Sequence, residues 1–92
     1  MGVKGMIIDK HTEAPIAKAV IEIEGIEKKI YSTDRGEYWR LLMPNETYKM
    51  TVSADGYVTS EPIEIVVKDG TDATDMVLKF VELLPKKFIE GE

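Results

Sequence analysis

Cysteine is absent from this 92-residue chain, and histidine occurs only once. Without a thiol the protein forms no disulfide and no thiolate metal site. His11 lies in the turn "DKHTEAP" near Asp9 and Glu13, but a metal ion needs three or more preorganised ligands, so we interpret His11 as a solvated loop residue. The motifs of serine hydrolases, zinc peptidases and phosphate-binding loops are also missing, so the sequence predicts no catalytic residue, no metal and no cofactor.

Long apolar runs and basic clusters are equally scarce. No run approaches the roughly 20 residues that a membrane-spanning helix needs, so we expect no membrane insertion. The formal net charge is -5, and the basic doublets Lys28-Lys29 and Lys86-Lys87 have acidic neighbours. Because nucleic-acid partners require clustered Lys and Arg, we expect no nucleic-acid partner. These absences leave one small acidic domain.

Short runs rich in Val, Ile, Thr and Tyr recur at intervals of about ten residues and are separated by Gly, Pro, Asn and Asp. Most of them alternate apolar and polar residues, which is typical of strands with one buried face. The pattern predicts an all-β fold, a β-sandwich of stacked sheets. The predicted strands are Val3 to Asp9, Ala19 to Glu24, Lys28 to Ser32, Glu37 to Leu42, Tyr48 to Ala54, Tyr57 to Pro62, Ile63 to Val67 and Thr74 to Phe80.

In four of these strands the alternation predicts which side chains face the core. They are Ala19, Ile21 and Ile23; Tyr48, Met50 and Val52; Ile63, Ile65 and Val67; and Met76, Leu78 and Phe80.

Two predicted strands carry apolar residues on both faces. In "VKGMIID" Val3 and Ile7 should face the core, which leaves Met6 and Ile8 on the opposite face, and "EYWRLLM" has no clean alternation. Two interpretations stay open: long side chains lying over a central strand, or a surface that docks onto another domain. The candidate interface residues are Met6, Ile8, Tyr38, Trp39 and Leu42.

Two further segments, residues 36–57 and 81–92, are interpreted from their composition. The stretch from Gly36 to Tyr57, "GEYWRLLMPNETYKMTVSADGY", holds the only Trp, and we interpret it as two strands of a hairpin joined by a Pro-containing turn. After Phe80, "VELLPKKFIEGE" contains Pro85, which interrupts any helix, so we expect residues 81–92 to form a loosely attached tail.

Five segments in this order resemble one known family. They are "GVKGMIID", "APIAKAVIEIEGI", "STDRGEYWRLLMP", "YKMTVSADGY" and "TDMVLKF", of which "GEYWRLL" followed by "YKxTxSAxGY" is the most specific. The chain resembles the transthyretin-like (carboxypeptidase regulatory-like) domain that follows the catalytic domain in N/E-type metallocarboxypeptidases such as carboxypeptidases D and E. The likeness covers residues 2–80 and leaves 81–92 outside it. Bacterial regulatory-like modules are the nearest competing family.

The resemblance implies a seven- or eight-stranded antiparallel β-sandwich of transthyretin-like topology that is not an enzyme. It would pack against the catalytic domain of a zinc carboxypeptidase of the secretory pathway or the extracellular space. The zinc ligands of that family belong to the catalytic domain, so no catalytic residue is carried over to this chain. No signal peptide precedes the first predicted strand, and we therefore expect the chain to be one domain of a larger secreted protein.

One turn departs from the family pattern. Where relatives usually have Pro-Gly-x-Tyr, this chain has Pro44-Asn45-Glu46-Thr47-Tyr48, which is one residue longer and lacks the Gly that tolerates positive φ. We therefore expect a rebuilt turn. The change also creates a sequon that makes Asn45 a candidate glycosylation site.

Three functions follow as hypotheses. The first is an accessory domain that stabilises a secreted metallocarboxypeptidase. The alternative is a free-standing binding module for carbohydrate or protein in which Trp39 and a Tyr form a stacking platform. A hydroxyisourate-hydrolase activity is disfavoured because it relies on several His and Arg residues and on a C-terminal "YRGS"-like ending, whereas this chain has one His and ends in "IEGE".

Unpaired sheet edges also predict self-association. The segments "YWRLLM" and "PIEIVV" combine high β-propensity with few charges. Carboxylates lose their charge as the pH falls towards about 4, so we expect assembly to be faster at mildly acid pH.

Overall fold

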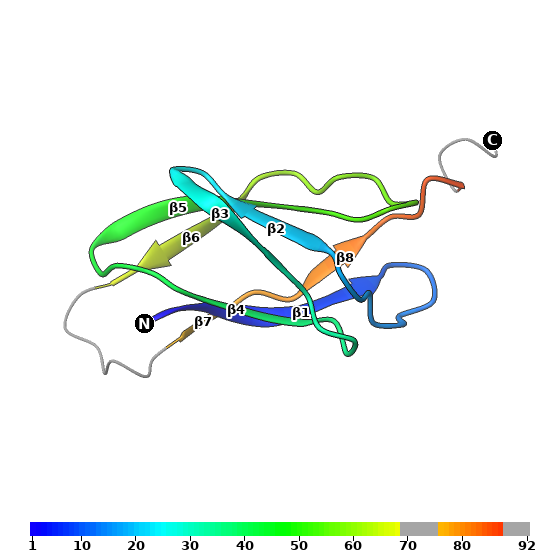
Figure 1. Ribbon diagram of the computed structural model, residues 1–92, viewed down its shortest axis with the longest axis horizontal. Coiled ribbons are helices and arrows are strands. Elements are labelled where there is room, and N and C mark those ends of the chain that lie inside the picture. Colours follow the sequence, from blue (N-terminus) through cyan, green and yellow to red (C-terminus); the bar gives the residue numbers. More distant parts are fainter. Residues whose placement is uncertain (69–75, 88–92) are drawn as a thin grey trace.

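The computed structural model is an eight-stranded β-sandwich, and it describes residues 1–68 and 76–87. Figure 1 shows two layers of strands that face each other. The strands are β1 (Gly2–Asp9), β2 (Val20–Ile23), β3 (Ile26–Tyr31), β4 (Glu37–Leu41), β5 (Glu46–Ser53), β6 (Ile63–Val67), β7 (Met76–Leu78) and β8 (Val81–Leu83). The transthyretin-like β-sandwich expected from the sequence is thus confirmed.

Strand β1 is the centre of the first sheet. It pairs antiparallel with β4 along one edge, and along its other edge it pairs parallel with β7 and then with β8. The second sheet has the order β3-β2-β5-β6, and its pairs are all antiparallel. The expected antiparallel arrangement therefore holds except where the C-terminal strands meet β1.

The core lies between the two sheets and is built from the inward residues of both. The alternation predicted for β2, β5 and β6 is confirmed, because Ile21, Met50 and Ile65 are fully buried. They pack with Val3 and Ile7 of β1 in one cluster. Burying each of these side chains contributes about 1.5–3 kcal/mol relative to leaving it exposed.

The face predicted for the strand after residue 74 is wrong. Thr74 and Asp75 lie outside the described residues, but in β7 Leu78 points outward and Val77 packs against the core. The reason is the register, since Val77 pairs with the buried Val3 of β1 and paired residues share a face. Phe80 is also exposed rather than buried.

The strand predicted from Tyr57 to Pro62 does not form. Its segment is irregular: the Val52 N–H donates to the Ser60 hydroxyl at 2.9 Å, and the Ser60 N–H donates to the Val52 carbonyl at 2.8 Å. A side-chain oxygen therefore replaces a backbone acceptor, and Pro62 has no N–H to continue a ladder.

The hairpin predicted between Gly36 and Tyr57 is also wrong. Strand β4 pairs with β1 in the first sheet, whereas β5 pairs with β2 and β6 in the second. The turn at Pro44 and Asn45 carries the chain from one layer to the other. Turn residues between two strands look the same whether the strands pair or change sheets, so the local sequence could not distinguish these cases.

The segment after Phe80 is part of the fold and not a loose tail. Val81 and Leu83 of β8 are buried, Leu83 with 1% of its surface exposed. The Leu83 carbonyl accepts a hydrogen bond from the Lys10 N–H at 2.9 Å, and Pro85 forms a bridge with Tyr57. Residues 88–92, which include Phe88 and Ile89, lie outside the described residues.

Between β7 and β8 the backbone of Lys79 lies close to Gly5 of β1. A Cβ at Gly5 would lie 1.9 Å from the Lys79 carbonyl oxygen, so only glycine fits there. The Tyr38 hydroxyl donates to the same carbonyl at 2.6 Å, and the Lys79 N–H donates to the Lys4 carbonyl at 2.9 Å. The backbone of residue 79 is thereby satisfied where the strand is interrupted.

Replacing Leu83 with Ala tests whether β8 belongs to the core. We expect Leu83→Ala to lower the free energy of unfolding by about 2–5 kcal/mol, because it removes a fully buried side chain. The matched control is Glu82→Ala on the exposed face of the same strand, with an expected change within about 0.5 kcal/mol. Urea unfolding measures both, and equal effects of the two variants would contradict the placement of β8.

Candidate functional site

The outer face of the first sheet is the candidate interface. Trp39 lies opposite Lys4, and Lys4 lies opposite Leu78, so the three form a row across β4, β1 and β7. Leu41 belongs to the same face through its pairing with Gly2. The ring of Trp39 is 63% exposed, and Leu41 and Leu78 are 72% and 57% exposed. We call this surface the outer face, defined by Met6, Ile8, Trp39, Leu41, Leu78 and Phe80.

The structure places the predicted interface residues in two groups. Met6 and Ile8 are half-buried on the outer face, and Trp39 is exposed there. Tyr38 and Leu42 are instead buried in the core, so their assignment to an interface is wrong. Tyr38 faces inward because its hydroxyl bonds to the Lys79 carbonyl, and burial raises the pKa of the Tyr38 phenol.

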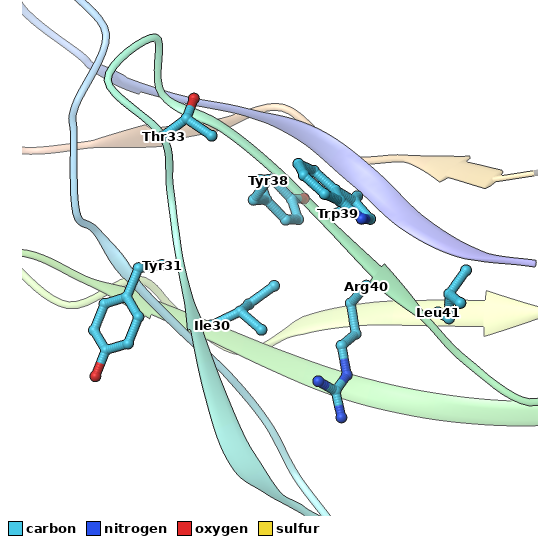
Figure 2. Close-up of a pocket in the computed structure, with 7 residues that line it drawn as sticks. All are labelled: Ile30, Tyr31, Thr33, Tyr38, Trp39, Arg40 and Leu41. Atoms are coloured by element: carbon cyan, nitrogen blue, oxygen red, sulfur yellow. The ribbon is translucent and has the colours of Figure 1, made fainter.

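A groove opens between β3 and β4, which are edge strands of different sheets. Its volume is about 520 Å³. Figure 2 shows Ile30 and Tyr31 on the β3 side, and Trp39, Arg40 and Leu41 along β4. Tyr31 is mostly exposed and Arg40 is half-buried. An aromatic pair and a guanidinium therefore line one apolar depression.

Asp9 organises the turn after β1. One carboxylate oxygen accepts hydrogen bonds from the backbone N–H groups of His11, at 2.7 Å, and Thr12, at 2.9 Å. The other accepts the Tyr57 hydroxyl at 2.7 Å. The bond from Thr12, then that from Tyr57, lowers the pKa of Asp9, and the bond to Asp9 raises the pKa of Tyr57.

These contacts give Asp9 a structural role that sequence reasoning missed. From the sequence alone, Asp9 is considered only as a metal ligand beside His11, and that site lacks enough preorganised ligands. The missed signal was local, since an Asp that starts a turn commonly bonds to backbone N–H groups two or three residues on. Within residues 1–68 and 76–87 no three metal-binding side chains converge, and no helix is long and apolar enough to cross a membrane.

Asn45 lies exposed at the tip of the turn between β4 and β5. Its φ is 61°, so Asn45 itself adopts the left-handed conformation that Gly tolerates most readily. Asn tolerates this region better than most residues, which explains how the rebuilt turn closes. Its glycosylation stays a prediction.

Both segments for which the sequence predicts self-association lie at sheet edges. "YWRLLM" contains most of β4 and "PIEIVV" contains β6, and each strand is the last of its sheet on one side. The association itself stays a prediction.

Comparison with protein-family models matches residues 2–79 to the carboxypeptidase regulatory-like domain. The chain belongs to this family. The domain is the non-catalytic, regulatory-like part of carboxypeptidases.

Three relatives illustrate the match. The chain is 41% identical to carboxypeptidase D of Drosophila melanogaster over 81 residues, which are 86% of this chain and 6% of that protein. It is 36% identical to carboxypeptidase Z of Gallus gallus over 96% of this chain and 14% of that protein. It is 36% identical to the carboxypeptidase N catalytic chain of Mus musculus over 85% of this chain and 17% of that protein. The regulatory-like domain thus spans a small part of each relative.

A solved streptococcal ancillary pilin has a similar fold. Its TM-score with this chain is 0.67 at 18% sequence identity, over 91% of this chain and 29% of the pilin chain. At this identity the likeness concerns the fold alone.

The Asp9 contacts predict a specific dependence of stability on pH. The folded pKa of Asp9 lies below its ordinary value of 3.8, so its charge stabilises the fold above that pH, and the contribution disappears as the pH falls through the folded pKa. We expect Asp9→Asn to be less stable than the parent at pH 7, with a gap that narrows below about pH 4. Asp55→Asn, in an exposed turn, is the control. A gap of constant size in unfolding experiments from pH 7 to pH 3 would contradict this role of Asp9.

Exposure of Trp39 predicts a small effect of its removal. We expect Trp39→Ala to lower the free energy of unfolding by less than about 1 kcal/mol, because most of the ring already contacts water. Tyr38→Ala, one position along β4 but buried, should lower it by about 3–5 kcal/mol. Urea unfolding of the two variants makes the comparison, and a loss at Trp39 as large as that at Tyr38 would show that the indole is packed.

Proposed function

We propose that this chain is an accessory domain that packs on the catalytic domain of a secreted zinc metallocarboxypeptidase and stabilises it. The observation that carries the proposal is the contrast between the outer surfaces of the two sheets. The first sheet presents the apolar outer face, with Trp39, Leu41 and Leu78 largely in contact with water. Lys4 lies in the row between Trp39 and Leu78, so this face is mostly and not uniformly apolar. Several large exposed apolar side chains on one face mark a site of protein contact.

The second sheet serves as an internal comparison. Its outward positions are mostly polar and include Glu22, Lys29, Lys49, Thr51 and Glu64. Glu22 and Lys29 form an ion pair at 3.8 Å, and both remain half-exposed to solvent. Such a surface is suited to water, whereas the outer face of the first sheet is suited to a partner. Family membership supports a carboxypeptidase catalytic domain as that partner, because the relatives are many times longer than this chain.

Location in the secretory pathway belongs to the same proposal. The zinc chemistry would reside in the partner domain, and this chain would contribute rigidity and surface. In that compartment the exposed Asn45 would meet the glycosylation machinery, because its sequon is intact and lies at a turn.

A domain exchange tests the proposal. In Drosophila carboxypeptidase D, this chain would replace the regulatory-like domain to which it is 41% identical, and the midpoint of thermal unfolding of the adjoining catalytic domain would be measured. We expect Leu78→Ser in the exchanged domain to lower that midpoint, because a hydroxyl would enter an apolar contact. Val66→Ser, an exposed apolar position on the second sheet, is the matched control and should leave it unchanged. Equal midpoints of thermal unfolding for the parent, Leu78→Ser and Val66→Ser proteins would contradict the proposal.

A ligand-binding module is the second candidate function. It is favoured by the exposed ring of Trp39, which lines the groove together with Tyr31 and Arg40. A buried Trp39 could not stack on a ligand, so the exposure of Trp39 is required for a binding platform. The chemistry of this groove identifies a class of ligand.

A further inference from the structure

The groove between β3 and β4 is a gap between two open sheet edges. Strand β3 is the last strand of the second sheet, and β4 is the last strand of the first. The turn from Thr33 to Gly36 joins them, and beyond it the two strands diverge (Figure 2). Each strand therefore has one edge without a neighbouring strand, and the two open edges face the same groove.

The register of β4 shows which backbone groups are free. The Leu42 N–H donates to the Met1 carbonyl at 3.1 Å, and the Ile7 N–H donates to the Gly36 carbonyl at 2.7 Å. In an antiparallel ladder every second residue bonds to the partner strand, so Tyr38 and Arg40 bond to β1 and the residues between them point away from it.

The backbone N–H and C=O groups of β4 that point away from β1 divide into two sets. At Glu37 they are occupied, because the Thr33 N–H donates to the Glu37 carbonyl at 2.8 Å and the Glu37 N–H donates to the Thr33 hydroxyl at 3.2 Å. At Trp39 and Leu41 the N–H and C=O groups have no partner within the described part of the chain. Unpaired groups of this kind are a template for one more strand.

The side chain of Arg40 determines which charge a ligand of the groove should carry. Arg40 shares its face of β4 with the buried Tyr38 and Leu42, and the residue is half-buried where it lines the groove. Among the described residues no carboxylate forms an ion pair with Arg40. A partly desolvated cation in an apolar groove binds a carboxylate more strongly than one in open water does.

We propose that the groove binds an extended peptide segment of another protein, which adds to β4 as an extra strand of the first sheet. The backbone groups of Trp39 and Leu41 would pair with the peptide, as in other complexes where a strand is added to a sheet edge. An acidic residue of the peptide would lie opposite Arg40, and apolar residues on either side of it would lie opposite Trp39 and Leu41.

Charge complementarity favours such a peptide over a second copy of this chain. The carboxylate of β4 is Glu37, which lies on the opposite face of the strand from Arg40. Because paired residues share a face, a second β4 added in sheet geometry cannot bring its Glu37 to Arg40. Two copies also carry a formal charge of -5 each.

This inference rests on the binding-module function, and its site shares Trp39 and Leu41 with the outer face. Variants separate the two proposals, since Arg40 belongs to the groove alone and Leu78 to the outer face alone.

The test uses the full chain and the synthetic peptide acetyl-Thr-Thr-Val-Glu-Val-Thr-Thr-amide, titrated to millimolar concentration. Amide hydrogen exchange, followed by nuclear magnetic resonance, reads out single backbone groups. We expect the peptide to slow exchange at Trp39 and Leu41 by at least about tenfold, while Tyr38 and Arg40, which are already bonded to β1, change little. Arg40→Gln should weaken binding of the peptide by about tenfold or more. Lys49→Gln, on the second sheet, and Leu78→Ser should leave it unchanged.

Two control peptides test the two parts of the proposal. Glutamine in place of glutamate should weaken binding to the parent chain but not to Arg40→Gln. N-methylation of both valines removes backbone donors and should abolish the protection at Trp39 and Leu41.

Other outcomes would overturn the proposal. Protection of the same amides that rises with protein concentration and without peptide would assign the edge to a second copy. Binding of an oligosaccharide that shifts the Trp39 ring signals, together with no response to the peptide, would assign the groove to carbohydrate. Peptide binding that is indifferent to Arg40 and to N-methylation would reject strand addition.

Discussion

The hydrogen bond from the Tyr38 hydroxyl to the Lys79 carbonyl joins three parts of the chain that are far apart in sequence. It crosses Gly5 of β1, where a side chain would collide with the accepting carbonyl. Because Tyr38 must point inward to make this bond, its neighbours Trp39 and Leu41 must point outward, and Arg40 must return to the inner face. The orientation of β4, and with it both the outer face and the groove, depends on this one contact.

Alternation made the sandwich and much of its core predictable from sequence. Ile21, Met50 and Ile65 each lie in runs where one face is clearly apolar, and a period of two leaves no choice of side. The partners of the strands could not be predicted in the same way. A Pro-Asn turn joins β4 to β5 whether or not they pair, and nothing local to Val81–Leu83 indicates that the segment completes β1 in parallel. Long-range pairing is decided by the whole core and not by the segment itself.

The candidate site was predictable only in part for the same reason. Met6, Ile8 and Trp39 lie on the outer face as the sequence suggested, but Tyr38 and Leu42 do not. In "EYWRLLM" both faces are apolar, so composition cannot decide which set is buried, and the decision comes from an acceptor 41 residues away. The groove could not be predicted for a further reason. It consists of backbone groups and an Arg40 side chain that have no partner among residues 1–68 and 76–87, and these exist only once β3 and β4 end their sheets.

The parallel pairing of β1 with β7 and β8 has a consequence for how the protein is made. Within this domain, residues 2–9 leave the ribosome before β7 and β8, with which they pair in parallel. Such long-range pairing is slow, because a long loop must close before any contact repays its entropy. One edge of the central strand therefore has no partner until β7 and β8 have been synthesised. A nascent chain that stops short of β7 and β8 therefore presents an open edge in the middle of its first sheet.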